Sequence, residues 1–172
     1  MIVTITALLL LVQTSMSQLT KNCDMEASLE ADPVHVSAPV AFDAIEPKSA
    51  IEVCLGALSD RLDKQTRGRI WLQLGRGYLK NHQISSAKAA FEKSVSHGYG
   101  AGYFALGVMY WLGDDIKRDP DLAKAYLEEA YSNGVFWSAK ILQDLYDDKE
   151  SHLYDKSLAD YYEKTWSEFV LN

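Results

Sequence analysis

The sequence predicts an all-α protein built from stacked helix pairs, and two observations support this fold class. Hydrophobic residues make up 48% of the 172 residues, which suffices for a buried core. The chain also repeats itself, because Ala87–Gly98 aligns with Ala123–Gly134 at an offset of 36, with six identities in twelve positions. Repeats of roughly 20 to 50 residues are typical of solenoids, in which each unit packs on its neighbours.

A second alignment locates the first helix of each unit. The segment Leu74–Tyr78 aligns with Leu106–Tyr110 at an offset of 32, and the two share Leu, Gly and Tyr. The difference between the offsets predicts a four-residue insertion near Gly113–Ile116, in the turn between paired helices. A third, degraded copy runs from Leu142 to Trp166, as expected of a terminal unit.

The ends of the second helices carry their own signals. Asp119 and Pro120 have the residue types preferred at the cap and the first position of a helix. Gly98 and Gly134 stand where a helix ends on a left-handed residue. Each unit is therefore predicted to be helix, turn, helix.

These residues resemble the Sel1-like repeat, a relative of the tetratricopeptide repeat. The pattern A-L-G-x-x-Y-x-x-G begins at Ala105, and D-x-x-x-A-x-x-Y-L-x-x-A-x-x-x-G begins at Asp119. The resemblance extends from Arg69 to the C-terminus, about 60% of the chain. It implies a short right-handed α-α superhelix of about three helix pairs.

The N-terminus is predicted to be a signal peptide over residues 1–17, cleaved before Gln18. The run from Ile2 to Val12 is almost entirely apolar, and no charged side chain precedes Lys21. Such a run is too short for a membrane span, which needs roughly 20 residues, but it suits the apolar region of a signal peptide. An uncleaved anchor or a buried helix is the alternative. We expect a periplasmic or secreted protein.

Cys23 and Cys54 are the only cysteines, and an even number in an oxidising compartment predicts one disulfide. Residues 18–46 are rich in proline and lack periodicity, so we expect an extended arm that this disulfide tethers to the repeat domain, residues 47–172. The arm resembles the leader of exported bacterial Sel1-like proteins, in which two cysteines bracket an F-x-A-I segment, here Phe42–Ile45.

Composition and motifs exclude several function classes. The formal charge of −7 argues against a nucleic-acid ligand. The four histidines are scattered and the two cysteines are far apart, so we expect no metal and no cofactor. Neither a G-x-S-x-G elbow nor an H-E-x-x-H helix occurs, which predicts a protein that is not an enzyme.

The predicted architecture supplies a groove, because the first helix of each stacked pair lines the concave side. Its composition would be basic at one end, aromatic in the middle and acidic at the other end. For Trp111 and Trp137, which we expect in this groove, burial in the core is the alternative. The candidate partner-binding residues are Arg69, Leu72, Arg76, Lys80, Phe104, Val108, Trp111, Trp137, Lys140 and Asp144.

We therefore expect a monomeric, non-catalytic scaffold that binds another protein through this groove. Exported proteins that resemble this family include immunity proteins that neutralise toxic effectors, regulators of envelope sensor kinases and envelope adaptors, and each is a candidate role. Some cysteine-rich relatives are described as β-lactamases or penicillin binders, so a weak β-lactam-binding enzyme is the rival. Those relatives have a disulfide in each repeat, whereas the repeats here contain no cysteine.

Overall fold

The computed structural model describes residues 16–114 and 116–171, and within them the regular structure is helical, without strands. A helix over residues 16–27 precedes the short 3-10 helix η1 (Phe42–Ala44). The all-α prediction is confirmed. The remaining helices are α2 (Pro47–Ala57), α3 (Lys64–Lys80), α4 (Ile84–Ser96), α5 (Gly100–Leu112), α6 (Pro120–Ser132), α7 (Ser138–Asp147) and α8 (Lys156–Val170).

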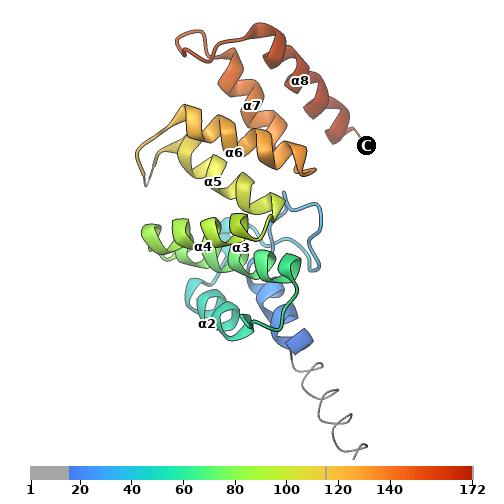
Figure 1. Cartoon of the computed structure of the whole chain (residues 1–172), viewed down its shortest axis with the longest axis vertical. Helices are drawn as coiled ribbons and strands as arrows, with labels where there is room; N and C mark the ends of the chain where they lie inside the picture. The colour runs from blue at the N-terminus through green and yellow to red at the C-terminus, as the bar shows by residue number, and fades with distance from the viewer. Residues whose placement is uncertain (1–15, 115, 172) are drawn as a thin grey trace, which may run out of the picture.

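Adjacent helices pack in pairs, α3 with α4, α5 with α6 and α7 with α8, and the pairs follow one another along the long axis of the molecule (Figure 1). Three residues separate α3 from α4, whereas seven separate α5 from α6. The predicted four-residue insertion is therefore present in the second pair. The degraded third copy also forms a helix pair, as predicted.

The same close contact recurs inside the first two pairs. A Cβ added to Gly75 of α3 would collide with the ring of Phe91 in α4. A Cβ added to Gly107 of α5 would lie 2.7 Å from Cγ of Leu127 in α6. The two glycines are 32 residues apart and their partners 36 apart, which are the two offsets found in the sequence. A glycine in each first helix thus lets a bulky side chain of the second helix approach its backbone.

The predicted helix ends are also confirmed. Gly98 and Gly134 have φ angles of 68° and 85°, so each provides the left-handed residue that follows α4 or α6. Asp119 Oδ1 accepts a hydrogen bond from the backbone N–H of Leu122 at 3.0 Å, and Pro120 is the first residue of α6.

The N-terminal region differs from the extended arm that we expected for residues 18–46. Residues 16–27 are helical because Thr20, Cys23, Asp24 and Ala27 share one buried face against the rest of the chain. Residues 28–46 are irregular apart from η1. The Cys23–Cys54 disulfide is present, as predicted, and joins this region to α2. Residues 1–15 of the predicted signal peptide lie outside the described residues.

None of the helices in the described ranges combines the length and hydropathy that a membrane span requires.

We predict that Gly107→Ala destabilises the protein by about 1 to 3 kcal/mol, because the new methyl group overpacks the α5–α6 contact at Leu127. Gly56→Ala in α2 is the matched control, since a Cβ there meets nothing within 4 Å. That variant should be neutral or stabilised by up to about 1 kcal/mol through helix propensity. Urea unfolding of both variants measures the difference, and equal changes would contradict the predicted helix packing.

Candidate functional site

One stripe of α3 faces the chain's own N-terminal segment, defined here as residues 16–46. Arg69, Gln73, Arg76 and Lys80 share a helical face. Asp24 is buried, and its Oδ1 accepts hydrogen bonds from Arg69 Nε at 3.0 Å and from Gln73 Nε2 at 2.7 Å. The ammonium of Lys80 lies 5.4 Å from the centre of the ring of Phe42. The N-terminal segment therefore covers α3 through polar and cation–π contacts.

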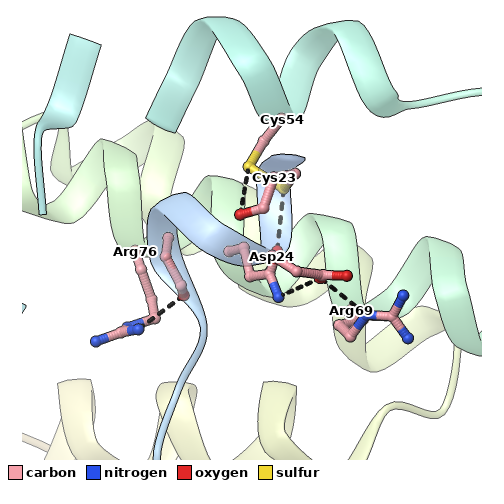
Figure 2. The surroundings of a disulfide bond; sticks show 7 residues. Cys23, Asp24, Cys54, Arg69 and Arg76 are labelled. Atoms are coloured by element: carbon pink, nitrogen blue, oxygen red, sulfur yellow. Dashed lines mark hydrogen bonds and ion pairs between the residues drawn. A yellow bond between two sulfur atoms is a disulfide. The ribbon is translucent and has the colours of Figure 1, made fainter. Parts of the chain in front are cut away.

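Arg76 of α3 donates three hydrogen bonds to the N-terminal segment, and Figure 2 shows it beside that segment. Its Nη1 donates to the carbonyls of Ala27 at 2.7 Å and Ser28 at 2.6 Å, and its Nη2 donates to the carbonyl of Val40 at 2.9 Å. The residue is only 7% exposed, and no carboxylate of the described residues lies within 4 Å of it. Burial lowers the pKa of Arg76 to about 10, so the guanidinium stays charged at neutral pH.

The disulfide holds the N-terminal segment at its helical end, as Figure 2 shows. Both cysteines are fully buried, together with Ile70 and Leu74 of α3. Gln73 links this cluster to the ion pair, because its Oε1 lies 3.0 Å from Cys23 Sγ while its amide nitrogen donates to Asp24.

A second buried carboxylate anchors the middle of the segment beside the start of α5. Asp32 Oδ2 accepts a hydrogen bond from the hydroxyl of Tyr99 at 2.5 Å, and its Oδ1 accepts one from the N–H of Val34 at 3.1 Å. Burial raises the pKa of Asp32, and these hydrogen bonds oppose the rise. Burial and the neighbouring carboxylate raise the pKa of Tyr99, so this hydroxyl is a hydrogen-bond donor at physiological pH.

The expected exposure of the basic end of the groove is wrong. Leu72 is fully buried among side chains of α4 and α5, and Arg76 is buried under the N-terminal segment. Arg69 is ion-paired with Asp24, with 13% of its side chain exposed, and Lys80 is half-buried against Phe42. The four α3 residues therefore contribute to the core or hold the chain's own segment.

The other six candidate residues keep exposed surface on α5 and α7, and together they are called the α5–α7 face. Trp111 is half-buried, and the guanidinium of Arg118 lies 4.6 Å from the centre of its ring. Trp137 is half-buried and packs edge-on against Trp166, with centroids 5.4 Å apart. The face consists of Phe104, Val108, Trp111, Trp137, Lys140 and Asp144, and its last two members form an ion pair at 2.7 Å.

An apolar pocket of about 210 Å³ opens between α3, α5 and the N-terminal segment. Three candidate residues line it, namely Arg76, Phe104 and Val108. Leu79 of α3 also lines it. Sequence reasoning missed Leu29 and Phe42, because their position depends on how residues 16–46 fold back on α3. The other missed lining residues are Phe91, Ala105, Met109, Leu112, Asp114 and Ile116.

An S-x-x-K spacing, a possible nucleophile pattern that the sequence reasoning did not identify, occurs at Ser85 and Lys88 in the first turns of α4. Lys88 Nζ donates to Glu92 Oε1 at 2.8 Å, and this contact raises the pKa of Lys88. A general base needs a lowered lysine pKa, so the arrangement does not suit activation of Ser85.

No cluster of His, Cys, Asp or Glu in the described ranges has the geometry to hold a metal ion. Comparison with protein-family models, curated proteins and solved structures gives no significant match. The geometry of the chain itself therefore carries the functional argument.

We predict that replacing both cysteines with serine lowers the free energy of unfolding by about 3 to 4 kcal/mol, because the disulfide closes a loop between residues 31 positions apart. Urea unfolding measures the loss. Reduction of the wild-type protein by dithiothreitol is the control and should give the same loss. A change below about 1 kcal/mol would contradict a stabilising role for the tether.

We predict that the stability of the wild type relative to Asp32→Asn falls as pH rises. The folded-state pKa of Asp32 lies above its ordinary value of 3.8, so its contribution is fully present below that value and is lost as pH rises through the folded-state pKa. Urea unfolding of both proteins between about pH 3 and pH 7 measures the trend.

Asp63→Asn provides the control of opposite sign. Hydrogen bonds from Thr66 lower the pKa of Asp63, so its contribution is present above the ordinary value and is lost as pH falls. The same trend in both variants would contradict the assigned role of burial at Asp32.

Proposed function

We propose that this chain is an exported Sel1-like repeat scaffold that binds another protein through its α5–α7 face and catalyses no reaction. The recurring glycine contacts at Gly75 and Gly107 support equivalent helix pairs, arranged in a short right-handed superhelix. The disulfide supports an oxidising compartment, and we place the protein in the periplasm or outside the cell.

The proposal rests on a contrast between helices. The N-terminal segment covers α3, whereas the aromatic residues of the α5–α7 face stay partly exposed. Phe104, Trp111 and Trp137 are each half-buried, so their rings are held in place while part of their surface contacts solvent. Anchored aromatic residues of this kind dominate binding energy at protein interfaces. Lys140 and Asp144 supply the charged rim that surrounds such anchors.

The partner that we favour is a toxic secreted effector, which makes the chain an immunity protein. Neutralisation requires a tight surface of roughly 800 Å² on each partner and no catalytic group. A sensor kinase or another envelope protein would use the same face, so the identity of the bound protein distinguishes these roles.

We predict that Trp111→Ala and Trp137→Ala each weaken partner binding by about 2 kcal/mol or more, roughly thirtyfold, because each removes an aromatic anchor. The exported, tagged chain is purified with its partner, and calorimetry then measures the dissociation constants. Tyr154→Ala is the matched control, since Tyr154 is 42% exposed in the α7–α8 loop and is not one of the six residues of this face.

Circular dichroism first establishes that each variant is folded. A partner that binds the wild type and both folded tryptophan variants equally would contradict binding through this face. A partner that is cleaved or modified by the purified chain would contradict the non-catalytic proposal.

A further inference from the structure

The pocket between α3, α5 and the N-terminal segment has the composition of a site for a small amphiphile. Its walls are almost entirely apolar, with Leu79 from α3, Val108 and Leu112 from α5, and Leu29 and Phe42 from the segment. Phe42 and Leu112 also expose 44% and 56% of their surface, so the pocket opens to solvent beside apolar side chains. An apolar chain entering here would exchange contact with water for contact with these apolar side chains.

Arg76 gives this apolar pocket a positive charge. The guanidinium has five N–H donors, and its three hydrogen bonds to backbone carbonyls account for three of them. Those acceptors are neutral, and the described part of the chain places no carboxylate within 4 Å of the group. A buried cation without an anionic partner is costly, so an anion delivered to this wall would gain a strong electrostatic contact.

We propose that this pocket binds a single-chain carboxylate amphiphile, with its apolar tail among Val108, Leu79 and Phe42 and its carboxylate against Arg76. This role goes beyond the protein-binding role proposed above: the pocket shares Phe104 and Val108 with the α5–α7 face, but its ligand occupies the interior of the pocket. The ammonium of Lys80, placed over Phe42, adds a second positive charge near the same wall. Asp114 lies on the loop after α5, so the carboxylate belongs on the α3 side of the pocket.

The size of the pocket limits the tail. A cavity of roughly 150 Å³ lined by Leu, Ile and Phe binds benzene. A pocket of about 210 Å³ therefore accommodates a hydrocarbon group somewhat larger than benzene. Octanoate is therefore a suitable probe. Octanol has the same tail and no charge, so a comparison of the two isolates the contribution of Arg76.

The test titrates the full, disulfide-bonded chain at neutral pH with octanoate and with octanol, using calorimetry and chemical-shift mapping. We expect octanoate to bind at least about tenfold more tightly than octanol, because only the carboxylate forms a charged hydrogen bond. The largest shift changes should fall on Leu79, Val108 and Leu112. Equal affinities for the two probes, or binding of neither, would overturn the proposal.

Two variants test the pocket separately from the charge. Val108→Trp fills the pocket and should abolish binding of both probes, whereas Val36→Trp, at a site 57% exposed outside the pocket, should leave both affinities unchanged. Arg76→Met should bring the octanoate-to-octanol ratio close to one. If Arg76→Met does not fold, the wild-type ratio and the Val108→Trp result decide the proposal. Octanoate binding that survives in folded Val108→Trp would overturn it.

Discussion

The burial of the Arg76 guanidinium beneath the N-terminal segment is the constraint on which the rest of the site depends. Moving a cation out of water costs several kcal/mol unless fixed polar groups replace its hydration. Here the replacements are backbone carbonyls at the end of the first helix and at Val40. Those carbonyls lie in place only when residues 16–46 fold back on α3, so the charge and the segment stabilise each other's position.

Much of the fold could be predicted from the sequence because its determinants are local. The turn after α4 depends on Gly98, the start of α6 depends on Asp119 and Pro120, and the two repeat offsets recur as contacts between helices. The course of the N-terminal segment depends instead on single polar contacts between residues about 50 positions apart. Such contacts leave no periodic pattern in a sequence. Because arginine is ordinarily exposed, no signal in the sequence indicated that Arg76 is buried.

The difference between local determinants and contacts distant in sequence also explains why the candidate site was only partly predicted. Arg76 and Val108 occupy equivalent positions in the sequence alignment, and transferring repeat geometry places both on the inner face. In α5 that inference succeeds, because Val108 lines an open pocket. In α3 the N-terminal segment covers the equivalent position and buries Arg76. Repeat geometry determines which way a side chain points, whereas the flanking segment determines whether it meets solvent.

The polar contacts that hold the segment need not be individually strong, because the chain restrains it at both ends. Cys23 is bonded to α2, and Glu46 continues directly into the same helix at Pro47. Residues 24–46 therefore form a closed loop, whose ends keep the intervening carbonyls at high effective concentration near α3. A tether of this kind makes ordinary hydrogen bonds sufficient to keep a guanidinium buried. It thereby fixes one wall of the pocket, while the residues of the α5–α7 face stay partly exposed to solvent.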